Sequence, residues 1–166
     1  MRLFIAIDVS DNLKDFFSIY NKSLNSIPGL RVVSPSKLHL TLDFIGDEDP
    51  KKIVAKLKKV KFKPFFLETD KFGFFPNKEN IRVVWLGLKP SSNLQDLKNK
   101  VGKNTEFIPH ITIARSNSLT SRSKNKLIKV LKRPDIKFKV TNFKLYNSEL
   151  TPLGYIYTLL ESFEAK

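Results

Sequence analysis

The chain of 166 residues contains no cysteine, only two histidines, and 16 acidic residues against 30 basic ones. Without cysteine, disulfide bonds, thiolate zinc sites and a cysteine nucleophile are all excluded. The shortage of acidic residues leaves a formal charge of 30 − 16 = +14 at pH 7. This charge favours polyanionic partners, namely nucleic acids, nucleotides or acidic membrane surfaces, although a lysine-rich solvated surface gives the same balance.

Long apolar runs are also missing, because no uncharged apolar stretch approaches the roughly 18 residues that a membrane-spanning helix needs. Residues 1–8 are too short and too soon interrupted by charge to resemble a signal peptide. We therefore expect a soluble, cytoplasmic protein. A hydrophobic content of 41% suits a single domain over residues 1–166, built as two lobes and not as two independent domains.

The hydrophobic pattern alternates between strand and helix along the chain. Strands are predicted at residues 3–9, 30–33, 39–46, 65–72, 81–88, 107–114, 136–145 and 155–163. Helices are predicted to begin at Ser10 or Asp11, at Asp49-Pro50, at Ser91 or Ser92, and within residues 120–131. A shift of apolar parity before Phe143 suggests a bulge near Thr141-Asn142. The order indicates a mostly antiparallel α+β fold in two lobes related by a rough internal repeat.

The two histidines share one local pattern, His39-Leu40-Thr41-Leu42 and His110-Ile111-Thr112-Ile113. At average residue frequencies a given histidine carries this pattern by chance about once in 200. Strand-rich sequence raises that frequency, since threonine and aliphatic residues both favour strands, but it does not remove the coincidence. A single histidine on a strand is usually structural, whereas a matched pair indicates a shared role.

Alternation along a strand assigns these residues to faces. In the first copy an apolar face is expected from Leu38, Leu40, Leu42 and Phe44, and a polar face from His39, Thr41 and Asp43. In the second copy Ile111 and Ile113 point inward, whereas His110 and Thr112 point to the other side. Two such strands facing across a groove would bring two imidazoles and two hydroxyls into one site.

This set of groups suits phosphodiester chemistry without a metal. One imidazole can take a proton from the nucleophile and the other can give a proton to the departing oxygen, because the reference pKa of histidine is about 6.5. The hydroxyls of Thr41 and Thr112 can donate hydrogen bonds to nonbridging phosphate oxygens, on which charge accumulates in the transition state.

Several segments together resemble the 2′-5′ RNA ligase family, also called RNA 2′,3′-cyclic phosphodiesterase, within the two-histidine phosphoesterase superfamily. The resemblance rests on Phe4-Ile5-Ala6-Ile7-Asp8, Leu38-His39-Leu40-Thr41-Leu42-Asp43-Phe44-Ile45-Gly46, Arg82-Val83-Val84-Trp85-Leu86-Gly87, Pro109-His110-Ile111-Thr112-Ile113-Ala114-Arg115 and Leu145-Tyr146-Asn147-Ser148. It spans nearly the whole chain. It implies two pseudo-repeated, mostly antiparallel sheets with outer helices around a central cleft that carries both His-x-Thr motifs.

The resemblance also implies an activity, the hydrolysis of RNA 2′,3′-cyclic phosphate ends to 2′-phosphomonoesters, with weak ATP-independent 2′-5′ ligation as a related reversal. His39 would protonate the departing 3′ oxygen and His110 would activate water, although these two roles can be exchanged. Thr41, Thr112 and Arg115 would hold the phosphate, and Phe44 would stack on a base. Strict alternation instead groups Phe44 with Leu40 and Leu42, and Arg115 with Ile111 and Ile113.

The expected partner is RNA with 2′,3′-cyclic phosphate ends, tRNA fragments included, and the protein is expected to act as a monomer without metal, cofactor or membrane. Three alternatives stay open. A non-catalytic RNA-binding protein explains the charge but needs no paired His-x-Thr. A metal hydrolase needs about three ligands, so Asp43 would have to join the histidines. A phosphodiesterase for small cyclic nucleotides or 2′-5′ oligonucleotides would use the same catalytic pair.

Overall fold

The computed structural model describes residues 1–103 and 105–166, and within them it contains nine strands, four α helices and one short 3₁₀ helix. The strands are β1 (Arg2–Asp8), β2 (Arg31–Val32), β3 (His39–Asp47), β4 (Phe65–Pro76), β5 (Ile81–Leu88), β6 (His110–Arg115), β7 (Lys137–Val140), β8 (Asn142–Thr151) and β9 (Gly154–Glu164). The helices are α1 (Asp11–Asn25), η1 (Pro35–Lys37), α2 (Pro50–Leu57), α3 (Ser92–Val101) and α4 (Ser121–Val130). In the described part of the chain, no helix is both long and apolar enough to cross a membrane.

The α helices begin where the sequence predicts. The N-cap residues are Ser10, Asp49, Ser91 and Thr120, and each side chain accepts a hydrogen bond from a backbone N–H of the first turn. A cap of this kind stabilises a helix by about 1 kcal/mol, because it satisfies an amide that has no partner within the helix.

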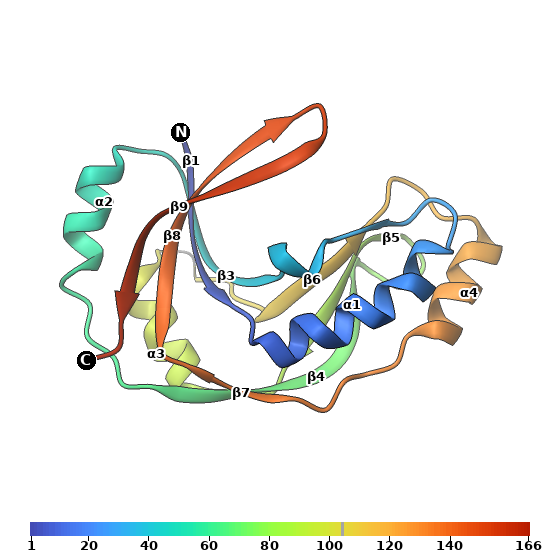
Figure 1. Ribbon diagram of the computed structural model, residues 1–166, viewed down its shortest axis with the longest axis horizontal. Coiled ribbons are helices and arrows are strands. Elements are labelled where there is room, and N and C mark those ends of the chain that lie inside the picture. Colours follow the sequence, from blue (N-terminus) through green and yellow to red (C-terminus); the bar gives the residue numbers. More distant parts are fainter. Residues whose placement is uncertain (104) are drawn as a thin grey trace.

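The strands form one curved sheet in the order β7-β4-β5-β6-β3-β1-β8-β9, with β2 added beside β6 (Figure 1). Every described pairing is antiparallel, so the predicted α+β, mostly antiparallel fold is confirmed. The two expected sheets are the two halves of this single sheet. They join at its centre between β3 and β6, through the residue pair Leu40 and Ile111.

The halves of the sheet interleave along the chain. One half contains β3 and β1 from the N-terminal part together with β8 and β9 from the C-terminus. The other half contains β4, β5 and β6 together with β7. Neither half is therefore a continuous stretch of chain, and each needs a strand from the far end of the sequence to be complete.

The prediction of one continuous strand over residues 136–145 is wrong, because two strands, β7 and β8, occupy this segment. β7 pairs with β4, whereas β8 begins at Asn142 and pairs with β1 and β9. The chain leaves one half of the sheet at Thr141 and enters the other, which explains the parity shift that suggested a bulge. The strand predicted from residue 107 also begins later, at His110, since Pro109 has no N–H to donate to a ladder.

The two faces of the central strands have different neighbours. One face packs under the helices and forms the core. The strands contribute Leu3, Ile5, Ile7, Leu40, Leu42, Ile111 and Ile113 to this core, and helices α1 and α3 contribute Leu13, Phe17, Leu24, Leu94, Leu97 and Val101. Phe4 and Ala6 of β1 are also buried, but they alternate with these core residues and point to the opposite face. That second face carries the candidate functional groups.

Gly73 of β4 leaves room for the indole of its cross-strand partner Trp85. A Cβ at Gly73 would lie only 2.1 Å from Trp85 Cζ2. We predict that Gly73→Ala lowers the free energy of unfolding by about 1–3 kcal/mol, because the indole must shift in a packed site. Thermal unfolding followed by circular dichroism measures this loss. In a Trp85→Leu background the same substitution should cost little, and an unchanged cost there would show that the indole is not the cause.

Candidate active site

The two His-x-Thr motifs lie on strands that are direct neighbours in the sheet, and not on strands that face each other across a groove. β3 and β6 are antiparallel and meet at Leu40 and Ile111. In an antiparallel register, this pair brings Thr41 to the position opposite His110 and Thr112 to the position opposite His39. The four groups that the sequence singles out therefore belong to one site, at the junction of the two sheet halves.

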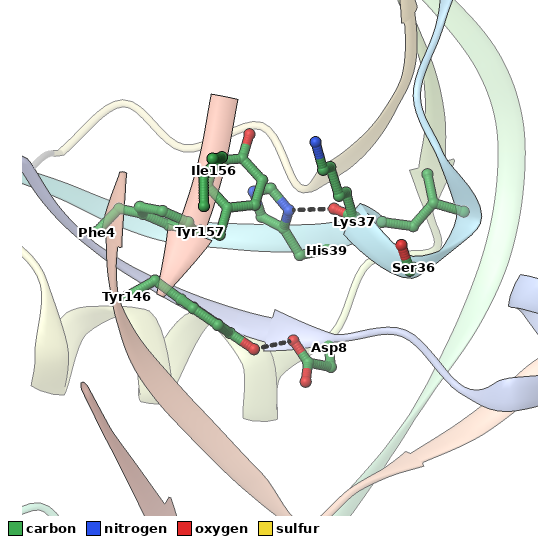
Figure 2. Close-up of a pocket in the computed structure, with 9 residues that line it drawn as sticks. Phe4, Asp8, Ser36, Lys37, His39, Tyr146, Ile156 and Tyr157 are labelled. Carbon is green, nitrogen blue, oxygen red and sulfur yellow. Dashed lines mark hydrogen bonds between the residues drawn. The ribbon is translucent and has the colours of Figure 1, made fainter. Parts of the chain in front are cut away.

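Both imidazole rings are held by the same backbone contact. His39 Nδ1 lies 2.8 Å from the carbonyl oxygen of Lys37, and His110 Nδ1 lies 2.6 Å from the carbonyl oxygen of Ile108 (Figure 2 shows the former). A carbonyl oxygen only accepts, so Nδ1 carries the proton in each ring. Nε2 is then an acceptor in the neutral ring and a donor in the cation, which suits it for proton transfer.

The pKa of His39 is lowered from its ordinary value of 6.5, chiefly because burial disfavours the charged ring. The Lys37 carbonyl and the negative charge of Asp8 act in the opposite direction, whereas the positive charge of Arg115 and the His110 ring lower the pKa further. His39 therefore interacts electrostatically with groups from both halves of the sheet, Asp8 on one side and Arg115 and His110 on the other.

Asp8 lies opposite His39 in the β1–β3 register. One of its carboxylate oxygens accepts a hydrogen bond from Tyr146 Oη at 2.8 Å, and the other lies 2.6 Å from Lys144 Nζ. Burial, together with Asp8, raises the pKa of Tyr146, so the phenol keeps its proton and remains a donor. Gly87 occupies the corresponding position opposite His110. The two histidines thus have different electrostatic surroundings.

Each histidine also packs against two aromatic rings. The ring of His39 lies 5.2 Å from that of Phe4 and 5.4 Å from that of Tyr157, centroid to centroid. The ring of His110 lies 5.1 Å from Phe75 and 5.9 Å from Trp85. Sequence reasoning assigned no role to Phe4, Asp8, Phe75 or Tyr157. Phe4 and Asp8 lie in a segment that carries the family resemblance, but no local pattern marks Phe75 or Tyr157, because strand pairing alone brings them to the histidines.

A β-bulge follows each motif at the same distance from its histidine. The β1–β3 register passes over Leu42, and the β5–β6 register passes over Ile113, three residues after His39 and His110 respectively. A bulge shifts the alternation of side chains between the two faces. Strict alternation therefore fails beyond these points in both strands.

The bulges explain where Phe44 and Arg115 lie. Phe44 is 78% exposed, and its ring centroid lies 6.3 Å from that of Phe4, which itself contacts His39. Arg115 is exposed at the end of β6. Its charge adds to the larger effect of burial in lowering the pKa of His39, and it partly offsets the burial that raises the pKa of Tyr157. Both residues are thus near the His39 side of the sheet, and the grouping that strict alternation gave them is wrong.

Asp43 does not lie beside the histidines, so its expected place on the polar face is wrong. Its carboxylate lies 3.7 Å from the Nζ of Lys98, a buried residue of α3, and accepts a hydrogen bond from the Lys103 amide at 3.2 Å. Past the bulge at Leu42, the side chain of Asp43 turns to the helix side of the sheet. The metal-site hypothesis needs Asp43 as a third ligand, and among residues 1–103 and 105–166 no three His, Cys, Asp or Glu side chains form a group that could hold a metal ion.

A cavity of about 280 Å³ opens beside His39 (Figure 2). Its walls come from five elements, with Phe4 and Asp8 from β1, Lys37 from η1, His39 from β3, Tyr146 from β8 and Tyr157 from β9. The lining combines the aromatic rings of Phe4, Tyr146 and Tyr157 with the polar side chains of Asp8 and Lys37. A cavity with these walls can accept a group that combines an apolar face with hydrogen-bonding atoms.

The fold and the paired histidines define a class of protein. The model of the 2′-5′ RNA ligase superfamily matches residues 28–152 of the chain. The chain therefore belongs to the 2′-5′ RNA ligase superfamily, as the sequence resemblance predicted.

Individual relatives are similar over nearly the whole chain. The chain is 33% identical to the RNA 2′,3′-cyclic phosphodiesterase of Archaeoglobus fulgidus, covering 99% of this chain and 100% of the relative. It is 38% identical to the RNA 2′,3′-cyclic phosphodiesterase of Thermotoga maritima, covering 96% and 93%. The predicted enzyme class is thus confirmed at the level of the family.

Solved structures agree with the fold. A crystal structure of TT0787 from Thermus thermophilus has a TM-score of 0.83 with 26% identity, covering 99% of this chain and 97% of that one. A crystal structure of E. coli LigT complexed with 3′-AMP has a TM-score of 0.79 with 25% identity, covering the same shares of the two chains.

Titration of His39 tests the electrostatics of the site. We predict an NMR pKa for His39 below 6.5, since burial disfavours the cation. Asp8→Asn should lower that pKa further, because it removes a negative charge that stabilises the charged ring. With only two histidines in the chain, His110→Gln assigns the resonances. A pKa for His39 that stays unchanged in Asp8→Asn would contradict this account.

Proposed function

We propose that this protein hydrolyses 2′,3′-cyclic phosphate ends of RNA to 2′-phosphomonoesters, with His39 and His110 as a pair of proton-transfer groups and without a metal ion. The observation that carries the proposal is the matched orientation of the two rings. Each Nδ1 is bound to a backbone carbonyl, which leaves each Nε2 for proton transfer on neighbouring strands. In-line cleavage needs such a pair, with one acceptor and one donor.

In the proposed reaction water attacks the phosphorus atom while the bond from phosphorus to the 3′ oxygen breaks. One histidine removes a proton from the water and the other gives a proton to the departing oxygen, so the pair ends with its protons exchanged. The lowered pKa of His39 favours its neutral form, and we therefore assign proton removal to His39 and proton donation to His110. This assignment exchanges the roles that the resemblance implies.

The remaining candidate residues supply binding and charge stabilisation in this proposal. Thr41 and Thr112 donate hydrogen bonds to the nonbridging oxygens, and the guanidinium of Arg115 offsets their charge. Support for Arg115 comes from its electrostatic effect on His39. Phe44 stacks on the base beside the cyclic end, a role supported by its 78% exposed ring.

The relatives and the net charge support the proposed substrate class. RNA 2′,3′-cyclic phosphodiesterases match nearly the whole chain, and a net charge of +14 favours a polyanion. We extend the proposal to RNA fragments such as those of tRNA, to a single domain over residues 1–166 that acts as a monomer in the cytoplasm, and to weak ATP-independent 2′-5′ ligation. Ligation uses the same two histidines, with a ribose 5′-hydroxyl in place of water.

Loss of either imidazole should abolish most turnover. We predict that His39→Ala and His110→Ala each lower kcat by about 100- to 10,000-fold on a short RNA with a 2′,3′-cyclic phosphate, because each removes a proton-transfer group. Thr41→Val and Thr112→Val should cost less, roughly 10- to 100-fold, since each removes one hydrogen bond to a charged group. Product analysis in the presence of EDTA measures both effects and should show a 2′-phosphate.

Circular dichroism of the four variants is the control for folding. Near wild-type turnover by either histidine variant would contradict the acid-base proposal. Activity that EDTA abolishes and a divalent metal restores would favour the metal hydrolase instead.

The dependence of kcat on pH separates the two role assignments. We predict that kcat falls on the acid side with a midpoint below 6.5, because a protonated His39 cannot accept a proton. That midpoint should move down with Asp8→Asn, and the acid-side midpoint of kcat/KM should match the NMR pKa of His39 in the free protein. If Asp8→Asn instead moves the fall of kcat on the alkaline side, His39 is the donor and the roles are the reverse of those assigned here.

A further inference from the structure

The β8–β9 hairpin extends beyond the body of the protein (Figure 1). It carries exposed apolar side chains. Leu150 is 69% exposed, Leu159 is 48% exposed and Tyr155 is 42% exposed. Neither core packing nor the proposed chemistry accounts for these side chains. A cluster of this kind on a globular domain usually marks a binding surface.

Strand register places these side chains on the same face as the cavity beside His39. The cross-strand pairs are Tyr146 with Leu159, Ser148 with Tyr157, and Leu150 with Tyr155. Residues two apart on a strand share a face, so these three pairs form one continuous strip. Tyr146 and Tyr157 line the cavity, and the strip therefore begins at the active site and runs to the tip of the hairpin.

The strip also connects to Phe44 through the neighbouring strands. Phe4 pairs with Tyr146 on one side and with Phe44 on the other. The ring centroids of Phe4 and Tyr146 lie 5.4 Å apart, with the rings stacked. Leu159, Tyr146, Phe4 and Phe44 thus form a row across β9, β8, β1 and β3. The hairpin strip and the ring proposed to bind the terminal base form one apolar surface.

Positive charges border this surface. Arg2 is exposed and pairs with Ser148, in the row next to Phe4. Lys37 donates a hydrogen bond from Nζ to the carbonyl oxygen of Tyr155 at 2.8 Å, which ties the hairpin to the residues before His39. Arg115 lies close enough to Tyr157 for its positive charge to offset part of the rise that burial causes in the pKa of that phenol. The hairpin's own acidic residue near the tip, Glu149, alternates with Ser148 and Leu150 and so belongs to the other face.

We infer that the β8–β9 hairpin binds the nucleotides on the 5′ side of the cyclic end, so that the preferred substrate is a single-stranded RNA chain and not a mononucleotide. Exposed rings and apolar side chains next to cations are the features that bind single-stranded RNA, with bases stacked on side chains and phosphates near the cations. Continuity with the cavity and the border of cations favour this occupant over a second copy of this chain, which also carries a net charge of +14. This inference rests on the proposed function and defines its substrate.

The test compares one enzyme on two substrates. The double variant Leu150→Ser with Tyr155→Ser removes a cross-strand pair at the tip without touching the cavity walls, and Ile19→Ser on α1, 75% exposed, is the matched control. The substrates are a decamer RNA ending in a 2′,3′-cyclic phosphate and adenosine 2′,3′-cyclic phosphate. We expect the double variant to lose about tenfold in kcat/KM on the decamer, mainly through KM, and to match the wild type on the mononucleotide. Ile19→Ser should change neither value.

An equal loss on both substrates, or no loss on either, would overturn the inference. A double variant that changes the sedimentation of the protein but not its preference for the decamer would identify the strip as a contact between copies, which also overturns it. Fluorescence anisotropy with a decamer ending in a 2′-phosphate tests the hairpin independently of turnover. If the wild type hydrolyses neither substrate, the proposed function fails, and the expected tenfold weaker binding by the double variant still decides the role of the hairpin.

Discussion

The site depends on one antiparallel contact, the pairing of Leu40 in β3 with Ile111 in β6. Both side chains are fully buried in the core, so the register between the strands is fixed by the packing of apolar groups on the helix side. A slip of either strand by one residue would turn that strand's own His-x-Thr set into the core. The hydrophobic core therefore determines which side chains meet on the opposite face, and the imidazoles and hydroxyls meet there because Leu40 and Ile111 pack where they do.

Around this contact the two halves repeat each other in geometry but not in electrostatics. Each histidine binds a carbonyl two residues earlier and packs against two aromatic rings. A carboxylate faces His39 from the neighbouring strand, whereas Gly87 faces His110. A reaction that needs one proton acceptor and one proton donor gains from this difference, because identical imidazoles would compete for the same protonation state.

Features that depend on a local sequence pattern could be predicted from the sequence. The positions of side chains that depend on strand pairing could not. Helix starts could be predicted because a capping side chain and its amide lie within three residues of each other. The paired motifs were visible because both histidines carry the same neighbours. The side on which Asp43 lies was not predictable, since the bulge at Leu42 exists only against β1. Tyr157 and Phe75 reach the histidines through pairings of β9 and β4 that no local pattern shows.

The bulges expose different residues at the same position of the two halves. In each strand the register passes over the third residue after the histidine, and the fifth residue after it is exposed on the site's side. That fifth residue is Phe44 in β3 and Arg115 in β6. An apolar ring suits the face of a base, and a guanidinium suits a phosphate. A substrate with one base and one terminal phosphate can satisfy both positions in only one orientation, with its base toward β3 and the hairpin. In the proposed binding mode, the same orientation directs the rest of an RNA chain along β8 and β9, so a difference at one position of a repeated strand pattern is enough to give the site a direction.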